Sequence, residues 1–292
     1  MELRLLEYYL AVVREGNISK AAEALHVTQP TLSRQMVQLE EELGTTLFHR
    51  GRQIELTDAG RMLKRRAEEI VSLVDKTEDE ISHPEDVEGV ISIGSGGLSS
   101  SEILTECMGG FRHQHPNVQF HLYTNSADYV SEQLDRGLLD FGLLLEPVDI
   151  SKFDYIRMKK KERWGLLLRK GHPLAQKEFI TKEDIWNETL IASNRLPVQK
   201  ELLNWIGKPE SELDIMATFN LITQGISIVD GGFASALTLE GSVNMLSDER
   251  LVFRPLYPEL IMTSVFAWKK SLPEYGAAGA FLQYFRKYAF EE

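Results

Sequence analysis

Residues 19–43, SKAAEALHVTQPTLSRQMVQLEEEL, have the pattern of two short helices joined by a tight turn. Ser19 is the expected N-cap of the first helix and Thr28 that of the second, because a hydroxyl can accept a hydrogen bond from a first-turn amide that lacks an intrahelical partner. Pro30 fits the first turn of the second helix for the same reason. The stretch therefore predicts a helix-turn-helix, a motif whose second helix enters the major groove of DNA.

The second of these helices has one apolar and one polar side. Its apolar side chains recur at spacings of four, three and four residues and should be buried: Leu32, Met36, Leu39 and Leu43. The opposite side carries hydroxyl, amide and guanidinium groups, the types that contact base edges and phosphates. Alone, such a side would indicate a solvated helix surface, but the short helix before it favours DNA binding. The expected DNA contacts here are Ser19, Thr28, Gln29, Pro30, Thr31, Ser33, Arg34 and Gln38.

The flanking residues complete a winged helix. An amphipathic helix over residues 2–15 supplies a packing base for the helix pair, and Gly16 and Asn17 end it. Residues 50–57 alternate between polar and apolar side chains and predict a short two-stranded wing. We expect Arg50 and Arg52 at its tip to contact phosphates or the minor groove, the alternative being that they are surface charges on a turn.

The same part of the chain carries a family resemblance. Its segments are, in order, SKAA (19–22), VTQPTLS (27–33), LEEELG (39–44), LFHR (47–50) and LTDAG (56–60). The run from Leu3 through Gly60 resembles the DNA-binding domain of LysR-type transcriptional regulators, with a wing one residue shorter than is common in that family. The resemblance implies a DNA-binding transcriptional regulator whose partner is double-stranded DNA at a dyad-symmetric promoter site.

A long helix follows the wing, beginning after Thr57 and lasting to about Ser82. Six of its side chains form an a/d stripe typical of a coiled coil: Leu63, Ala67, Ile70, Val74, Thr77 and Ile81. So narrow a stripe predicts pairing with a second copy, and a homodimer places two recognition helices on successive major-groove faces. The alternative is that the stripe packs on the chain's own C-terminal domain. The resemblance implies the homodimer, and also the pairing of dimers into tetramers.

Charge is unevenly divided along the chain. The 292 residues carry a net charge of −12, but residues 1–66 carry +1 and the remainder −13. An acidic bulk repels DNA at long range, so affinity should depend on a few placed arginines and on multivalent binding rather than on a broad basic surface.

Cysteine content and hydropathy restrict the compartment. Cys107 is the only cysteine in the sequence, which excludes an intramolecular disulfide and a cysteine-based zinc site. No apolar run approaches the roughly 20 residues that a membrane-spanning helix needs, and charges near the N-terminus interrupt any signal-peptide pattern. We expect a cytoplasmic protein with no membrane partner.

From residue 90 onward, short strands alternate with helices, which indicates mostly parallel sheets covered by helices. Residues 111–118 and 134–142 extend the family resemblance, which implies two α/β lobes similar to periplasmic ligand-binding proteins. The expected fold class is α+β multidomain. Its domains are a winged helix-turn-helix at 1–58, a linker helix and hinge at 59–87, and an effector-binding domain at 88–292, with lobe I at 88–163 and 268–292 and lobe II at 164–267.

In such a fold a small-molecule effector binds in the crevice at the carboxyl ends of the strands, where helix N-termini present free amides. Arg195 has the fork geometry to hold a carboxylate through two hydrogen bonds. For every candidate, helix capping or loop solvation is the alternative role. The expected effector contacts are Ser99, Ser100, Asn125, Ser126, Asn194, Arg195, Thr218 and Asn220.

The sequence offers no catalytic constellation, metal ligand set or cofactor motif. His113 and His115 lack accompanying ligands and indicate surface histidines at a helix end. The serines at 99–101 lack the GxSxG elbow of a nucleophile. The prediction is a one-component transcription factor that responds to an effector, with RNA polymerase as a further candidate partner. The competing hypothesis is an enzyme or transport-type binding protein with a helical N-terminal domain.

Overall fold

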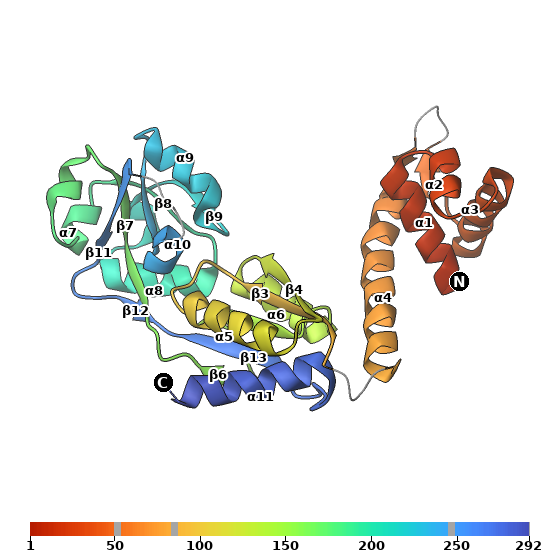
Figure 1. Ribbon diagram of the computed structural model, residues 1–292. Coiled ribbons are helices and arrows are strands. Elements are labelled where there is room, and N and C mark those ends of the chain that lie inside the picture. Colours follow the sequence, from red (N-terminus) through yellow and green to blue (C-terminus); the bar gives the residue numbers. More distant parts are fainter. Residues whose placement is uncertain (50–53, 83–86, 245–248, 292) are drawn as a thin grey trace. The chain divides into compact units, whose positions relative to one another are not determined.

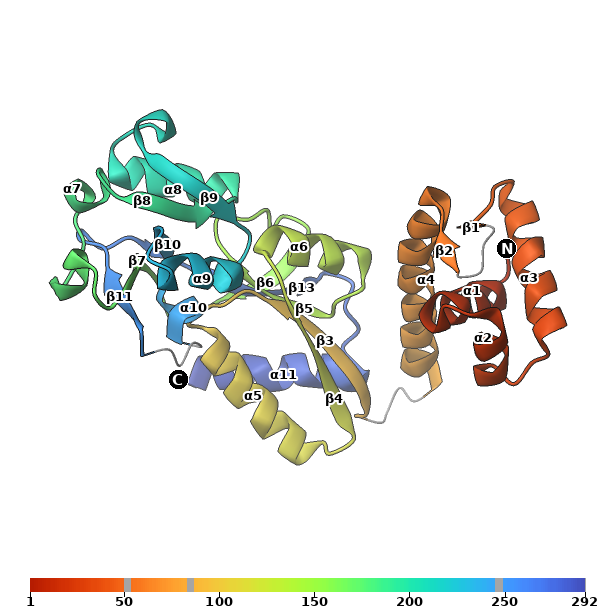
Figure 2. The same ribbon diagram turned by 90° about the horizontal axis from the view of Figure 1, so that it is seen from above.

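The computed structural model describes residues 1–49, 54–82, 87–244 and 249–291 (Figures 1 and 2). The chain divides into two compact units, Met1–His83 and Pro84–Glu292. No helix within these described ranges is both long enough and apolar enough to cross a membrane.

The N-terminal unit is a helical domain with a two-stranded ribbon. Its elements are α1 (Leu3–Glu15), α2 (Ile18–Ala24), α3 (Gln29–Leu43), β1 (Phe48–His49), β2 (Glu55–Leu56) and α4 (Asp58–Ser82). Helix α1 packs against α2, α3 and α4. Tyr9, which is fully buried, donates a hydrogen bond from its hydroxyl to the Gly60 carbonyl at 2.7 Å and so ties α1 to α4.

The helix ends follow the capping signals with one exception. Thr28 caps α3 as predicted, its Oγ1 accepting from the Thr31 amide at 3.4 Å. The prediction that Ser19 caps α2 is wrong, because the helix begins earlier, at Ile18. Asn17 is the N-cap, and its Oδ1 accepts from the amides of Ser19 (2.8 Å) and Lys20 (3.1 Å).

The apolar side of α3 is buried over three of its four predicted positions, Leu32, Met36 and Leu39. Leu43 is 39% exposed, so the prediction is wrong there. The helix ends at Gly44, whose φ of 65° turns the chain away from the helix axis. Leu47, which is 1% exposed, is buried in the core instead of Leu43.

Lobe I of the C-terminal unit is built on one sheet. Its described strands are β3 (Gly89–Ser95), β4 (Val118–Thr124), β5 (Phe141–Leu145), β6 (Phe153–Arg157) and β13 (Ser264–Lys269), in the order β4-β3-β5-β13-β6. The pairs of β3 with β4 and β5 are parallel, whereas β13 runs antiparallel to β5 and β6. Helices α5 (Ser101–Gln114) and α11 (Gly276–Glu291) pack on one face, and α6 (Ala127–Arg136) on the other.

Lobe II has a second mixed sheet. Its described strands are β7 (Glu162–Arg169), β8 (Thr189–Ser193), β9 (Asp214–Phe219), β10 (Ser235–Leu239), β11 (Leu251–Pro255) and β12 (Ile261–Met262). Their order is β11-β7-β10-β8-β9, and β12 pairs with β7. The helices are α7 (Lys182–Ile185), α8 (Leu196–Ile206), α9 (Gly225–Asp230) and α10 (Glu240–Asn244), with 3₁₀ turns η1 (Pro173–Gln176), η2 (Glu210–Glu212) and η3 (Ile222–Gln224).

The chain crosses between the lobes at residues 158–161 and again at Thr263. The predicted return to lobe I at residue 268 is therefore several residues late. The cause is that all of β13 pairs with β5, from Ser264 opposite Leu145 to Trp268 opposite Phe141. The last helix, α11, packs on α5 in lobe I, as expected.

Candidate functional site

The polar side of α3 is open to solvent. Arg34 projects from it and has no hydrogen bond or ion pair within the described part of the chain. Its charge is therefore available to an external anion such as a phosphate. The predicted contacts that are exposed on this side are Gln29, Pro30, Thr31, Arg34 and Gln38, while Ser33 is half-buried.

The C-terminal half of α3 is less suited to DNA. Gln38 donates from Nε2 to Glu42 at 2.9 Å and accepts from Gln35 Nε2 at 3.3 Å. The hydrogen bond from Gln38 and the nearby N-terminal amine lower the pKa of Glu42, so this end of the helix carries a carboxylate. Glu42 also pairs with the N-terminal amine of Met1 at 3.0 Å. Gln38 would therefore have to leave its partners Gln35 and Glu42 before it could contact a base.

The base of the wing forms, with Phe48 opposite Leu56 and His49 opposite Glu55 in an antiparallel pair. Arg50 and Arg52, predicted at the tip, lie outside the described residues. Their DNA contacts stay a prediction.

Helix α4 does not use all of its predicted stripe for a partner. Ala67 is fully buried and Leu63 half-buried, and both belong to the core that α1 closes. Their assignment to the dimer interface is wrong, because the first half of α4 has a partner surface within its own domain. Ile81 carries no described side chain.

A different side of α4 leaves apolar groups in solvent. Met62 is 65% exposed, Ile70 38% and Leu73 46%, and Thr77 is also exposed. Steps of about 100° per residue place these four on one side of the helix, next to the side that faces α1. Val74 has the same direction around the helix as Leu63 and Ala67 and is half-buried. Met62 and Leu73 were not predicted in the interface. The heptad chosen from the sequence followed the residues that pack on α1, and Met62 and Leu73 lie outside that heptad.

An open pocket lies between the two lobes of the C-terminal unit, and its empty volume, adjoining solvent included, is about 540 Å³. Lobe I contributes the loop at 96–98, the start of α6 and the ends of β5; lobe II contributes the start of β7, the ends of β8 to β10, and α8 and α10. Four of the predicted effector contacts line it: Asn125, Ser126, Arg195 and Asn220.

Ser99 and Ser100 do not line the pocket, so their prediction as effector contacts is wrong. Both amides donate to the carboxylate of Glu162, at 2.7 and 3.1 Å, and Ser100 Oγ donates to it at 2.7 Å. Glu162 is fully buried at the start of β7. A carboxylate of the chain itself therefore occupies the N-terminus of α5, where we expected an external anion. Sequence spacing gives no signal for this pairing across 62 residues.

Two glycines, Gly97 in the 94–98 loop and Gly241 in α10, allow close contact between the lobes. Ser242 of α10 donates from Oγ to the Gly97 carbonyl at 2.6 Å. A Cβ on Gly97 would stand 2.8 Å from that Oγ, and one on Gly241 would stand 2.1 Å from the Ser99 amide. The absence of a side chain at Gly97 and Gly241 thus lets the two lobes pack closely, and it does not serve to bind a phosphate.

Arg195 connects lobe II to lobe I. Its Nε and Nη2 donate to the Asp128 carboxylate at 3.1 and 2.8 Å. Nη1 and Nη2 also donate to the carbonyls of Leu145 (3.3 Å) and Pro147 (2.9 Å). The predicted two-bond carboxylate clamp exists, but within the chain it holds Asp128.

This contact should stabilise the two-lobed unit measurably. Asp128→Ala leaves the Arg195 guanidinium, 7% exposed, without its counter-charge. Because Asp128 is itself largely exposed, we expect a loss of only about 1–3 kcal/mol in the free energy of unfolding. Denaturant unfolding of the full chain measures it.

Asp135→Ala is the matched control, since Asp135 lies in the same helix and pairs with Lys152 on the surface within lobe I. Its expected loss is below about 0.5 kcal/mol. Equal losses for the two variants would mean that Arg195 does not hold the lobes.

Asn194 and Thr218 are also absent from the pocket wall. Asn194 is exposed, and its amide donates to the Phe219 carbonyl at 2.8 Å. Thr218 borders a separate hollow beside α8 and β9. Their neighbours Ser193, Phe219 and Asn220 do line the pocket. Adjacent residues of a strand face opposite sides, so a position at a strand end does not by itself show which of two neighbours faces the pocket.

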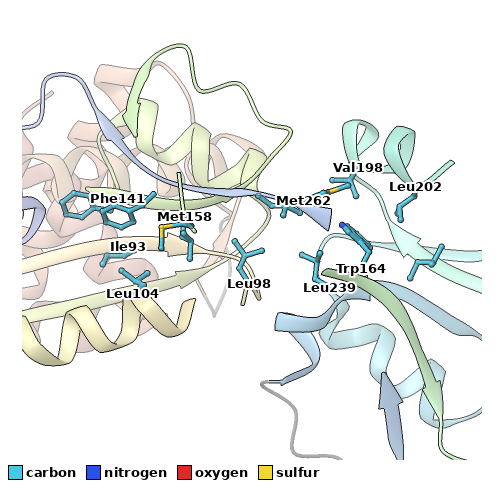
Figure 3. Packing of buried hydrophobic residues seen from close by; sticks show 14 of the residues in the cluster. Ile93, Leu98, Leu104, Phe141, Met158, Trp164, Val198, Leu202, Leu239 and Met262 are labelled. Atoms are coloured by element: carbon cyan, nitrogen blue, oxygen red, sulfur yellow. The ribbon is translucent and has the colours of Figure 1, made fainter. Parts of the chain in front are cut away.

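Trp164 was not predicted as a pocket residue. It follows the first lobe crossing, lines the pocket and is 3% exposed. Figure 3 shows it among apolar side chains from both lobes, including Leu98, Leu239 and Met262. Its indole nitrogen is buried and has no hydrogen-bond acceptor within the described residues.

Cys107 is fully buried in α5, and burial raises its pKa to about 12. At pH 8 only about one thiol in ten thousand is ionised, and the thiolate is the reactive form. We expect no reaction of the folded chain with a disulfide reagent such as DTNB at pH 8, and one thiol per chain after unfolding in guanidinium. Rapid labelling of the folded protein would contradict this burial.

The described elements define a class of protein: a winged helix-turn-helix unit with an exposed, polar recognition helix, joined to a two-lobed α/β unit with a pocket between its lobes. The comparisons agree. Residues 3–61 match the family model described as "Bacterial regulatory helix-turn-helix protein, lysR family", and residues 84–289 match "LysR substrate binding domain".

The similar proteins are also transcriptional regulators. The transcriptional regulator AlsR of Bacillus subtilis is 35% identical over 199 residues, which are 65% of this chain and 64% of AlsR. The crystal structure of CbnR, a LysR family transcriptional regulator, has a TM-score of 0.76 at 22% identity and covers 99% of both chains. Full-length CbnR complexed with its target DNA has a TM-score of 0.73 at 22% identity, covering 100% of this chain and 99% of that one.

The chain belongs to the LysR family of bacterial transcriptional regulators. It is a DNA-binding regulator with an effector-binding domain, and the relatives named above are regulators rather than enzymes.

Proposed function

We propose that the chain binds a dyad-symmetric promoter site as a homodimer, each copy placing the first turns of α3 in the major groove. The observation that carries this proposal is the unpaired Arg34 on an exposed polar side whose opposite side is buried. That CbnR was crystallised with its target DNA supports it. The proposed contacts are Thr28, Gln29, Pro30, Thr31, Ser33 and Arg34, with Ser19, Gln38, Arg50 and Arg52 at the margins.

The dimer forms through the exposed apolar side of α4, with Ile70, Leu73 and Thr77 in the interface and Val74 at its edge. Met62 extends the same side toward the N-terminus. Pairing of dimers into tetramers and contact with RNA polymerase are further parts of the proposal, as is a cytoplasmic location.

A small-molecule effector in the interlobe pocket modulates promoter binding. The lobes meet through the bonds of Arg195 to Asp128 and of Ser242 to Gly97, which lie at the pocket wall. A ligand that separates or tightens these contacts changes the relation of the lobes. In a dimer or tetramer this alters the spacing or bend that the paired winged helices impose on DNA.

A gel-shift titration of the full chain against its own promoter fragment tests the proposal. Binding that weakens steeply between about 50 and 200 mM salt, with a dyad at the protected site, supports it. Turnover of a metabolite without DNA affinity would instead favour the enzyme hypothesis.

A further inference from the structure

We propose that the ligand of the interlobe pocket is a small, mainly apolar molecule with an uncharged acceptor, a ketone or ester carbonyl, that accepts a hydrogen bond from Trp164 Nε1. This inference rests on the proposed function, because it names the ligand class of the same pocket.

The indole N–H of Trp164 is a buried donor without an acceptor among the described residues. A buried indole N–H ordinarily has an acceptor, and one without needs an explanation. Two other tryptophans of lobe II have theirs: Trp186 donates to the Ile206 carbonyl at 3.1 Å and Trp205 to the Pro258 carbonyl at 2.7 Å. Trp164 is more deeply buried than either and has no acceptor within the described ranges. It is the donor that the pocket has left for a ligand.

Apolar side chains from both lobes make up most of the pocket wall, so a ligand gains most of its affinity by burying apolar surface. The apolar lining residues are Leu98, Ala127, Leu143, Leu145, Trp164, Val198, Phe219, Leu221, Ile222 and Leu239.

The cation at the pocket wall and the amides at the start of α5 already have partners within the chain. Arg195 is the cation of the wall among the described lining residues, and its Nε and both terminal nitrogens already donate to Asp128 and to two carbonyls. The amides at the start of α5 already hold Glu162. A carboxylate ligand that used either of these donor sets would have to displace Asp128 or Glu162. The other polar groups of the described wall are uncharged hydroxyls and amides, including Ser126, Asn220 and Thr238, so no cation there lacks a partner to offset the charge of an acid. A neutral acceptor needs no such cation, so the wall favours an uncharged ligand.

A hydrogen bond to Trp164 Nε1 would also affect how the lobes are joined. Nε1 has almost no water-accessible surface, so a ligand reaches it only after the wall around it shifts. Trp164 lies near both crossings. It is three residues after the first crossing at 158–161, and the two residues between, Glu162 and Arg163, pair with Met262 and Ile261 just before the second crossing. Forming the bond therefore moves the segments that join the lobes.

Two matched triplets of probes test the ligand class on the full-length chain. One is ethylbenzene, acetophenone and benzoate; the other is ethylcyclohexane, cyclohexyl methyl ketone and cyclohexanecarboxylate. Each holds the ring constant and changes only the polar group. By titration calorimetry we expect the ketone to have the lowest Kd in at least one triplet, by about tenfold over the hydrocarbon, as one matched hydrogen bond gives.

Trp164→Phe keeps an aromatic ring in the wall but removes the indole N–H donor together with part of a buried ring. It lowers the Tm through the cavity it leaves, so the decisive readout is the comparison of ligands: the ketone should lose about tenfold more affinity than the hydrocarbon of the same triplet. Trp186→Phe is the matched control: it loses the bond to Ile206 and should lower the Tm while leaving ketone binding unchanged. Tighter binding of either acid than of its ketone overturns the inference, as does a ketone affinity that Trp164→Phe does not change, or the absence of ketone binding.

The same samples in a gel shift separate this inference from the proposed function. If a carboxylate binds the pocket and changes DNA affinity, the effector mechanism stands and the neutral-ligand inference fails. If a ketone binds through Trp164 and DNA affinity does not change, the inference stands and the effector mechanism fails.

Discussion

Arg34→Ala lowers promoter affinity more than any other single substitution in the DNA-binding unit. Arg34 is exposed on the first turns of α3 and has no partner within the described residues, so its guanidinium is available for the proposed DNA contact. A side chain of this kind contributes about 1–3 kcal/mol per contact, and a dimer loses two, which corresponds to a fall of roughly 30-fold or more in affinity. A gel shift on the promoter fragment at fixed salt measures the loss.

Two controls define what the Arg34 result means. Arg136→Ala removes an equally charged residue, paired with Glu132 in the C-terminal unit, and should leave DNA affinity within twofold. Arg34→Lys keeps the charge but not the two-pronged geometry, so partial recovery indicates phosphate contact and little recovery indicates a base contact. Full affinity in Arg34→Ala would place recognition elsewhere.

Ile70→Lys combined with Leu73→Lys yields monomers. Both side chains are apolar and exposed in the N-terminal unit, so lysines there leave the core intact but face like charges across a dimer interface. We expect sedimentation to report a species of about 33 kDa instead of a dimer, and promoter affinity to fall by at least 100-fold because both half-sites are no longer bound together.

Glu68→Lys combined with Ser72→Lys controls for added positive charge on the same helix. At about 100° per residue these two exposed residues lie roughly 170° and 130° around α4 from the middle of the Ile70–Leu73 side, so the variant should stay dimeric. An unchanged dimer for Ile70→Lys/Leu73→Lys, or a monomer for both variants, would reject the interface on that side of α4.

Local patterns predicted the DNA-binding unit well. The spacing of Leu32, Met36 and Leu39 and the cap at Thr28 depend on residues within a few positions of each other, and the structure confirms them. The errors arose where neighbours along the chain compete. Asn17 took the cap from Ser19, and α1 covered Ala67, which a heptad count assigns to a partner.

The pocket was harder to predict because its chemistry depends on pairs far apart in sequence. Arg195 meets Asp128 across 67 positions and Glu162 meets Ser99 across 63, and both pairs consume groups that looked available for a ligand. Strand-end position located the pocket, as Asn125, Ser126 and Asn220 show. It could not reveal which polar groups already have hydrogen-bond partners within the chain. Nor could it reveal that Trp164 Nε1 has no acceptor among the described residues.

The most direct test of the account is affinity cleavage of DNA from α3. Val37 is 50% exposed on that helix, and Cys107 is too deeply buried to react, so Val37→Cys accepts an iron–EDTA reagent selectively. On the promoter fragment we expect two clusters of DNA cleavage, separated by about 10 base pairs or a multiple of that spacing. Retained promoter binding by the labelled protein without cleavage near the dyad would contradict the placement of α3 in the major groove.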